Sequence, residues 1–351
     1  MTLVKAERRL GCKSRLVTLA HDDRDYEEDI CLDLPFLDFW GTRFAKNLFS
    51  HPSKLDVSSE RIQFPEIPIK WHPNGFPEKH LVAFREWVWQ PKIQRLFNEI
   101  DFWNFDVYQL DGGLEFFRDG RIIRQLKKQG KKIICCYIGS DLRTRGVIPE
   151  IDAVSDLNIS FEFDHLKLHP NIKHVFFPFD VAGFPQRSEE PSGNIKIGHA
   201  PTNRRAKGSD IITAVIEELK TEFSFEFLLI ENIPYREALH KKSQCHIFID
   251  QISELGYGIN ALESLAMGIP TCSSLAPDFV NTCPDHPFID INKNNLKHKL
   301  RELVQNTRLR QVKGCAGREW VDCHHNSVKV VEEIHKLADF ELSAAYISEL
   351  N

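Results

Sequence analysis

The sequence predicts an α/β protein with two doubly wound domains, each built on a parallel sheet that helices cover on both faces. Short apolar runs alternate with helical patterns in both halves of the chain, and this alternation is typical of parallel sheets. The 351 residues correspond to roughly two domains at about 150 residues each. Hydrophobic residues make up 42% of the chain, which is enough for two cores.

The first half of the chain predicts a partly irregular stretch followed by a strand-helix-strand unit. A helical pattern over residues 3–9 precedes a strand over 15–20, and residues 21–78 lack periodicity, so we expect irregular structure there with short helices around 44–49. Residues 81–100 predict an amphipathic helix that Pro91 kinks or divides, because proline removes a backbone donor. The elements expected after these are strands at 106–110, 132–137, 158–160 and 174–177 and a helix at 116–129 that ends at Gly130.

The second half alternates more regularly. The expected strands are 195–199, 226–230, 245–250 and 271–272, and the expected helices are 209–222, 235–242, 259–267, 296–307, 312–320 and 327–345. Between the halves, residues 180–194 are rich in proline, glycine, serine and charge and predict an exposed linker at the domain boundary. Ligands of such sheets bind beyond the carboxyl ends of the strands, so we expect functional residues in the loops that follow strands.

Composition limits the class of ligand and the compartment. Lys and Arg total 45 against 50 Asp and Glu, a net charge of −5, so no overall positive field attracts a nucleic acid, and an anionic ligand must be held locally.

Nine irregularly spaced cysteines favour a reducing cytoplasm over a disulfide framework. No apolar run reaches the roughly 18 residues of a spanning helix, and residues 1–13 lack the apolar core of a secretory signal. We therefore expect a soluble, cytoplasmic protein, with peripheral membrane contact left open.

The loop over residues 199–210 joins a predicted strand to a predicted helix and contains three cations. These are Arg204, Arg205 and Lys207. Together with the exposed amides of a first helical turn, they form a site suited to a phosphate or diphosphate. The alternative is a solvated loop in which Ser209 is the N-cap.

A second loop, over residues 250–263, also runs from a strand into a helix. Gly256 and Gly258 permit close backbone approach to a ligand, and the helix that begins near Ile259 directs amides to the same region. Glu263 stands among apolar residues one turn into that helix, where a buried carboxylate requires a partner such as a ribose diol. The alternative places Glu263 on the exposed, polar side of the helix.

These two segments together resemble the donor-binding half of a GT-B nucleotide-sugar glycosyltransferase. The first is His199-Ala-Pro-Thr-Asn-Arg with Lys207-Gly208, and the second is Gly256-Tyr-Gly-Ile-Asn-Ala-Leu-Glu263 through Gly268-Ile-Pro270. The chain is most similar to the large retaining group called family four or group one, specifically over residues 195–275. The resemblance implies two Rossmann-like domains, a donor in the cleft between them and no obligatory metal or cofactor, since the nucleoside-diphosphate sugar is a substrate.

The resemblance also implies roles for individual residues. Arg204 and Lys207 correspond to the residues that hold the donor diphosphate, with Arg205 as a substitute for Arg204, and Glu263 corresponds to the glutamate that holds the ribose hydroxyls. Preplaced cations stabilise the charge that develops on the departing nucleoside diphosphate. The residues expected to face the sugar and phosphate are Gly256, Tyr257, Gly258, Ile259 and Asn260. Asp111, at a strand end on the acceptor side, joins Arg204 and Lys207 among the catalytic candidates.

By the same resemblance the chain divides into an acceptor-side domain over 1–182, a donor domain over 193–325 and a final helix over 326–351 that crosses back to the first domain. The implied activity is sugar transfer with retention to a glycan, lipid-linked or small-molecule acceptor, as in polysaccharide biosynthesis. The alternative is a catalytically silent GT-B relative that binds a nucleotide sugar or a partner protein. A dehydrogenase or epimerase is disfavoured because no Gly-x-Gly-x-x-Gly follows the first strand.

Three departures from the family pattern accompany the resemblance. Leu255 stands where the family often has a first glutamate, with Glu254 beside it, so recognition of the donor sugar's hydroxyls is unassigned. Neither Gln109 nor Asp111 is the histidine that the family commonly has at that strand end. The family's opening strand and glycine loop have no counterpart ahead of the helix over 3–9, so we expect either that the chosen start is too late or that the acceptor-side domain lacks its first strand.

Four further groups of residues allow an ordinary and a functional interpretation. Cys315, Cys323, His324 and His325 do not have the spacing of a structural zinc finger, and we expect no metal there. Cys135 and Cys136 lie in a strand and are expected in the core. A third group, Gly139, Ser140 and Asp141 with Arg143 and Arg145, either forms a capped turn or contacts an acceptor or phosphate. The fourth group is aromatic and forms core, a sugar platform or a membrane-facing patch; its members are Trp87, Trp89, Phe102 and Trp103.

Overall fold

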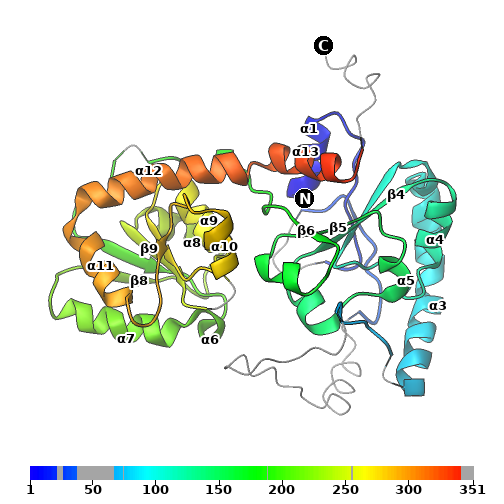
Figure 1. Cartoon of the computed structure of the whole chain (residues 1–351), viewed down its shortest axis with the longest axis horizontal. Helices are drawn as coiled ribbons and strands as arrows, with labels where there is room; N and C mark the ends of the chain where they lie inside the picture. Colours follow the sequence, from blue (N-terminus) through cyan, green and yellow to red (C-terminus); the bar gives the residue numbers. More distant parts are fainter. Residues whose placement is uncertain (22–26, 38–66, 74, 188, 254–255, 341–351) are drawn as a thin grey trace. The chain divides into compact units, whose positions relative to one another are not determined.

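The computed structural model describes residues 1–21, 27–37, 67–73, 75–187, 189–253 and 256–340 (Figure 1). The chain divides into two compact units. The first comprises Leu3–Val175 and Val331–Asn351, and the second comprises Phe176–Val330. The predicted short helices around 44–49, and the residues at 254 and 255, lie outside the described part of the chain.

The second unit contains a five-stranded parallel sheet of order β11-β10-β9-β7-β8. Its strands are β7 (Lys196–His199), β8 (Glu226–Leu229), β9 (Ile247–Gln251), β10 (Thr271–Ser273) and β11 (Ile289–Asp290). The chain adds β8 on one side of β7 and every later strand on the other side, so the direction of winding reverses between β7 and β9. In open α/β sheets, ligands bind beyond the carboxyl ends of the strands at such a reversal.

Helices cover both faces of this sheet. They are α6 (Arg204–Lys207), α7 (Ser209–Lys220), α8 (Tyr235–Ser243), α9 (Ile259–Ala266), α10 (Pro277–Thr282), α11 (Leu296–Gln305) and α12 (Thr307–His324), with the short η4 (Val181–Gly183). Ile247 and Ile249 pack with α7 and α11, while Phe248 between them packs with residues of α8 and with Met267 after α9. Figure 1 shows α7 and α11 on one side of the sheet and α8 and α9 on the other. Side chains alternate across the strand, so the continuous apolar run of β9 serves two cores.

The first unit contains a four-stranded parallel sheet of order β3-β4-β5-β6 and a separate two-stranded parallel sheet, β1-β2. The strands are β1 (Val17–Thr18), β2 (Ile30–Cys31), β3 (Val107–Asp111), β4 (Lys132–Tyr137), β5 (Leu157–Ser160) and β6 (Ile172–His174). The helices are α1 (Thr2–Arg9), α3 (Gly75–Glu99), η1 (Phe102–Asn104), α4 (Arg121–Lys128), η2 (Asp141–Arg145), α5 (Pro149–Asp152) and η3 (Phe163–Lys167). A further helix, α13 (Ser327–Leu337), begins in the second unit and belongs to the first from Val331 onward. Trp89, Ile93 and Leu96 of α3 pack with Ile123 of α4 and Ile133 of β4 in the largest core cluster of the first unit.

Several sequence predictions about these elements need correction. The helix expected at 116–129 begins only at Arg121, because Gly120 before it has a φ of +67° and ends a series of turns. The strand expected at 174–177 is Ile172–His174, and α13 ends at Leu337. Pro91 lies inside a single helix that continues to Glu99, so the chain is not divided into two helices there. The stretch at 180–194 is exposed or half-buried at its described residues apart from Val181, as predicted for a linker, and it is also anchored to the second unit, since the Arg187 guanidinium donates to the Cys245 carbonyl at 2.7 Å.

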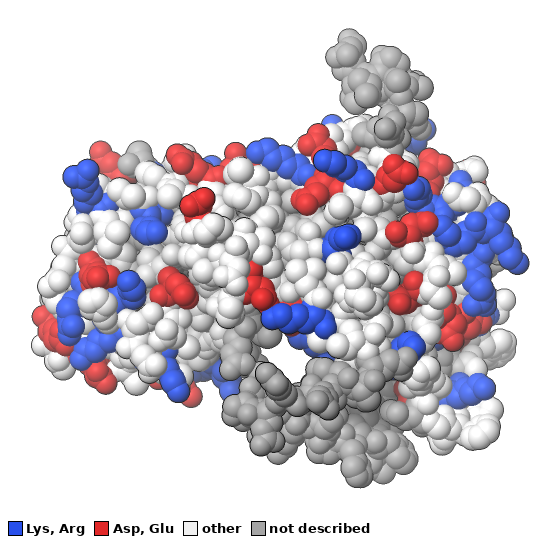
Figure 2. Space-filling view, viewed as in Figure 1, with Lys and Arg blue, Asp and Glu red and all other residues white. Residues whose placement is uncertain are grey.

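The surface carries both signs of charge. Figure 2 shows basic and acidic side chains interspersed over the face in view, in agreement with the small net charge of −5. Both neighbouring cysteines of β4, Cys135 and Cys136, are fully buried, as expected for core residues. Within the described ranges, no helix combines the length and the apolar content needed to cross a membrane.

Candidate functional site

The loops after β7 and β9 lie against each other at the point where the winding reverses. The amide of Ile252 donates to the carbonyl of Lys207 at 3.0 Å, which joins the two loops through their backbones. Gly208 makes this approach possible, because its φ is +67° and a Cβ added there would lie 2.7 Å from the Ile252 carbonyl oxygen. A side chain at this position would therefore separate the loops.

The three cations do not stand at the start of the long helix α7, as the sequence suggested. They lie in a helical turn of their own, α6, whose N-cap Asn203 accepts from the Ala206 amide at 3.0 Å. Gly208 is the N-cap of α7, so the N-cap role that the alternative interpretation gave to Ser209 is wrong. The Ser209 hydroxyl instead lies 2.8 Å from Nε2 of His199, whose Nδ1 lies 2.9 Å from the Ile249 carbonyl oxygen. This buried histidine ties β7, β9 and α7 together.

Lys207 is held by a carboxylate beneath it. Its ammonium donates to Oδ1 of Asp250 at 3.0 Å and to the Gln251 side-chain oxygen. The Asp250 side chain is 0% exposed, and its second oxygen accepts from the Gly258 amide at 2.8 Å. Asp250 thus fixes both the cation of the first loop and the glycine backbone of the second.

Gly258 is required here for space and not for backbone freedom. Its φ of −114° is open to any residue. A Cβ at this position would lie 2.9 Å from the Lys207 nitrogen, closer than real Cβ atoms approach other groups. The glycine therefore leaves room for the lysine head directly beside the first turn of α9, whose first amides have no partner within the helix.

Arg204 and Arg205 occupy the outer side of the same turn. Arg204 donates to both oxygens of Glu231, at 2.9 and 3.2 Å, and its side chain is about half exposed. Arg205 is exposed. An exposed ion pair contributes little to stability, on the order of 1 kcal/mol or less, so an anionic ligand can replace Glu231 at low cost.

Glu263 is buried, and the interpretation that placed it on the exposed side of the helix is wrong. Its side chain accepts from the Tyr235 hydroxyl at 2.9 Å and forms an ion pair with the ammonium of Lys242. Lys242 is itself 1% exposed and also donates to Oδ1 of Asn260 at 2.7 Å. Burial lowers the pKa of Lys242, and the Glu263 carboxylate opposes that shift. The sequence predicted that Glu263 needs a partner but not that a lysine of the same unit provides one.

The other residues singled out in the loop over 250–263 are placed by contacts within the second unit. The Asn260 amide group donates to the Ala200 carbonyl at 2.9 Å, which pins α9 to the end of β7, whereas the Ile259 side chain is exposed. Gly256 has a φ of +90°. Tyr257 stacks on Phe288 with ring centroids 4.7 Å apart, and its hydroxyl lies 3.1 Å from Nε2 of His325. Tyr257 therefore anchors the segment in an aromatic cluster.

His325 is not available to a metal in this arrangement. Its Nδ1 lies 2.7 Å from the Phe177 carbonyl oxygen, so it donates there while Nε2 accepts from Tyr257. Cys315 and Cys323 are exposed on α12. Among the described residues, a group of three metal-binding side chains that lie close together is found elsewhere, at His21, Glu28 and Cys31.

Asp111 lines a pocket in the first unit. This pocket has a volume of about 390 Å³ and lies at the carboxyl ends of β3 and β4; its lining residues are Asp111, Gly112, Leu114, Ile138, Ser140, Asp141 and Arg145. The Asp111 side chain reaches solvent, yet the surrounding loops remove enough of its hydration to raise its pKa, and the nearby Asp141 carboxylate adds to this effect. A carboxyl with a raised pKa in a pocket is suited to hydrogen bonding with a hydroxylated ligand.

The turn at 139–145 braces this pocket. Asp141 accepts from the amides of Ile138, Gly139 and Leu142 at 2.8 to 3.0 Å. Arg143 is paired with Asp164 and Glu162, at 2.6 to 2.7 Å, and so is held by carboxylates of the first unit.

The four aromatic residues singled out in the sequence do not form one surface. Trp89 and Phe102 are buried in the core of the first unit, and Trp103 packs against that core. Only Trp87 has a mostly exposed side chain, at 68%, where it lies 6.1 Å from the ring of Phe84. A shared sugar platform built from all four is excluded.

Sequence reasoning missed Lys242, Tyr235 and Glu231 as partners of the predicted residues. Lys242 and Tyr235 lie on α8, 21 and 28 positions from Glu263, and Glu231 lies 27 positions from Arg204. Only the packing of α8 against α9 brings the first two to Glu263. A lysine at the end of a polar helix carries no signal of its burial.

The sequence matches no family model and no curated protein sequence. The structure is similar to that of sucrose-phosphate synthase from Thermosynechococcus elongatus, with a TM-score of 0.53 and 13% identity over 76% of this chain and 80% of that chain. Similar structures also include Anabaena HepE in complex with UDP, with a TM-score of 0.49, 12% identity and coverage of 71% of this chain and 82% of that one. An alpha-glucosyltransferase in complex with UDP and DNA gives a TM-score of 0.48, 13% identity and coverage of 67% and 80%. At this identity the likeness shows the fold, and the predicted α/β architecture of the GT-B glycosyltransferases, with two Rossmann-like domains, is confirmed.

Proposed function

We propose that this chain is a glycosyltransferase that moves a sugar from a nucleoside-diphosphate sugar to a glycan, lipid-linked or small-molecule acceptor. The observation that carries the proposal is the contact between the two loops of the second unit. There the Lys207 ammonium is paired with Asp250 and lies beside the first turn of α9. This arrangement offers a cation and helix amides to a diphosphate at the place where sheets of this topology bind ligands. The resemblance of the sequence to the retaining group supports transfer with retention.

The chemistry we propose is stabilisation of the leaving group. Negative charge grows on the nucleoside diphosphate as the bond to the sugar breaks, and Arg204, Lys207 and the first amides of α9 are in place to receive it. Arg205 supplements Arg204, and Glu263 accepts from the ribose hydroxyls. Because these groups supply the positive charge, we propose that transfer needs no metal, so activity should persist in a chelator.

For the acceptor we propose the pocket of the first unit. Asp111 would contact the acceptor or the transferred sugar there, since it lines the pocket at the carboxyl end of β3. All nine cysteines are free thiols, which supports a reducing compartment such as the cytoplasm. If the acceptor is lipid-linked, a cytoplasmic chain would meet it at the inner surface of the membrane.

The donor site is tested by thermal unfolding of the chain with each nucleoside diphosphate and its sugar conjugates. A ligand at about a hundred times its dissociation constant adds about 2.7 kcal/mol, which raises the melting midpoint by several degrees. We expect one base to stabilise the native chain and Lys207→Ala to remove the effect. The matched control is Lys220→Ala, which removes an exposed lysine of the same unit that forms an ion pair with Glu217. Equal stabilisation of all three proteins would contradict the assignment.

The transfer step is tested separately, with the donor that binds. We expect Lys207→Ala to lower the turnover number about a hundredfold or more, as for other preorganised groups at a developing charge. Asp111→Asn should lower transfer while leaving donor binding unchanged. A chain that binds the donor and neither hydrolyses nor transfers its sugar is the catalytically silent relative.

A further inference from the structure

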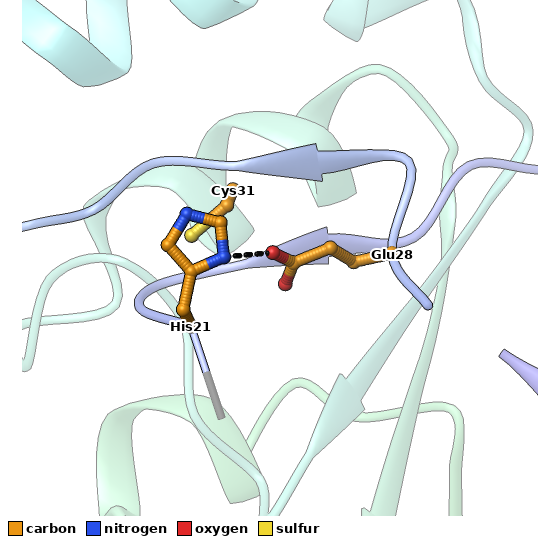
Figure 3. A group of neighbouring side chains, drawn as sticks. All are labelled: His21, Glu28 and Cys31. Atoms are coloured by element: carbon orange, nitrogen blue, oxygen red, sulfur yellow. Dashed lines mark ion pairs between the residues drawn. The ribbon is translucent and has the colours of Figure 1, made fainter. Parts of the chain in front are cut away.

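Three side chains with metal-binding atoms converge beside the small sheet of the first unit, away from the residues assigned above. They are His21, Glu28 and Cys31, and one ligand atom of each lies within 4.8 Å of the others. Figure 3 shows the His21 ring beside the Glu28 carboxylate and in front of the Cys31 thiol, so the three side chains converge. Nothing in the proposed glycosyl transfer uses them.

The backbone accounts for this convergence. β1 and β2 are parallel and in register, so Thr18 stands opposite Cys31. The ladder continues past the strands, with the Leu32 amide donating to Thr18 at 2.9 Å and the Leu34 amide donating to Leu19 at 2.7 Å. His21 follows this ladder on the first strand and Glu28 precedes it on the second. The three ligand positions are therefore held by paired main chain at both ends of one loop.

The Glu28 carboxylate is already oriented toward the histidine. Its Oε1 lies 2.5 Å from Nδ1 of His21, and its Oε2 accepts from the hydroxyl of Thr18. A hydroxyl that fixes the second oxygen of a ligating carboxylate is the kind of outer partner that metal sites use to hold their ligands. The His21 side chain is 71% exposed, so the open side of the group faces solvent.

The set of ligand types selects the cation. Zn²⁺ binds imidazole nitrogen, thiolate sulfur and carboxylate oxygen, whereas Ca²⁺ and Mg²⁺ take oxygen ligands. Zinc bonds of about 2.0 to 2.3 Å in a tetrahedron place the ligand atoms about 3.5 Å apart. The ligand atoms now lie within 4.8 Å of one another, so metal binding requires them to approach by up to about 1.3 Å. We propose that His21, Glu28 and Cys31 bind Zn²⁺, with water as the fourth ligand.

Binding requires the Cys31 thiol to lose its proton to solvent and His21 to be neutral at the ligating nitrogen. The bound ion then joins the end of β1 to the start of β2 across the loop between them. A simple surface ion pair between His21 and Glu28 is the competing explanation, and such pairs contribute little. The Cys31 thiol also hydrogen-bonds the Glu28 carboxylate, so the competing explanation is a polar cluster of all three side chains, and only the metal-binding measurements below separate the two.

The test uses the full chain and Zn²⁺ alone, measured by equilibrium dialysis with metal analysis. We expect one zinc per chain, and we expect His21→Ala and Cys31→Ser each to weaken binding at least about tenfold. Two control variants remove the same residue types elsewhere. His298→Ala breaks an exposed ion pair with Glu302 at 3.2 Å, which belongs to no group of three metal-binding side chains among the described residues, and Cys323→Ser removes an exposed thiol of α12. Both should bind zinc as the unchanged chain does.

A second measurement starts from the unchanged chain, in which no substitution can affect folding. Zinc should slow alkylation of Cys31, followed by mass spectrometry of its peptide, while the rate at Cys323 stays the same. His21→Ala should abolish this protection. The proposal is overturned if the unchanged chain shows no zinc-dependent protection of Cys31, or if it binds zinc with an affinity that neither His21→Ala nor Cys31→Ser reduces. Either result leaves the donor site untouched, because it lies in the other unit.

Discussion

The ammonium of Lys207 lies 3.0 Å from a carboxylate oxygen of Asp250, and the Asp250 side chain is completely buried. The pair joins the loops after two neighbouring strands, and the same carboxylate accepts from the Gly258 amide. A charge held in this way needs little rearrangement when a diphosphate arrives, which is the condition under which electrostatic groups stabilise a transition state best. Asp250 is thus a positioning residue for the proposed donor site.

Asp250→Asn should destabilise the second unit. Removing one member of a buried ion pair leaves the other without compensation and typically costs about 3 to 5 kcal/mol. Because Lys207 is not fully enclosed, we expect about 2 to 3 kcal/mol, measured as the change in the free energy of unfolding in urea. Asp210→Asn, which removes a carboxylate that is 92% exposed on α7, is the control and should have little effect. Equal losses in the two variants would show that the pair does not hold the loops.

Gly258→Ala should separate ligand binding from stability. The added methyl group would meet the Lys207 nitrogen at 2.9 Å, and that nitrogen is the mobile end of a long side chain, so the fold can adjust. The lysine must then leave Asp250 and the diphosphate position. We expect binding of the stabilising nucleoside diphosphate to weaken at least about tenfold, the value of one charge-assisted hydrogen bond, with only a small change in melting midpoint. Gly183→Ala is the control because a Cβ there meets nothing within 4 Å. Unchanged affinity in Gly258→Ala would remove Lys207 from the site.

Lys242 and Glu263 should behave as a coupled pair. Lys242→Met leaves a buried carboxylate without its cation, and Glu263→Leu leaves a buried ammonium, so each single substitution should cost about 3 to 5 kcal/mol. The double variant should recover much of this loss, because no uncompensated charge remains. A double-mutant cycle in urea measures the coupling, and additive losses would contradict the pair. In binding, Glu263→Gln should weaken a ribonucleoside diphosphate more than its 2′,3′-dideoxy analogue.

The sequence predicted most strands well because apolar runs between turn residues are local signals. The strand predicted at 132–137 is observed with the same bounds as β4. The helix predicted from 116 begins at Arg121, because the preceding glycines at 112, 113 and 120 adopt positive φ and no periodicity encodes such turns. Residues placed by contacts distant in the chain, such as Lys242 beneath Glu263, have no local signal at all.

The meeting of the two predicted loops followed from a general rule of sheet topology, whereas their internal chemistry did not. Loops after neighbouring parallel strands share one edge of a sheet, so residues 199–210 and 250–263 were expected together, and Ile252 bonds Lys207 directly. The acidic partners of the cations, Asp250 and Glu231, depend on side-chain directions that a single sequence does not specify.

Glu115 should make the stability of the first unit fall as pH rises. Its side chain is 9% exposed, and burial raises its pKa from the ordinary 4.5 to about 8, although the Ile123 amide donates to it at 3.0 Å. Between these two pKa values the folded chain keeps the proton while the unfolded chain releases it, so the stabilising contribution is complete below the lower pKa and is lost as pH rises through the upper one.

Glu115→Gln removes this titration. We expect the free energy of unfolding of the unchanged chain to fall, relative to the variant, by on the order of 3 kcal/mol between about pH 5 and about pH 8. Glu99→Gln, which replaces an exposed glutamate of α3, should preserve the pH dependence of the unchanged chain, and parallel curves for the unchanged chain and Glu115→Gln would show that Glu115 is ionised in the folded state.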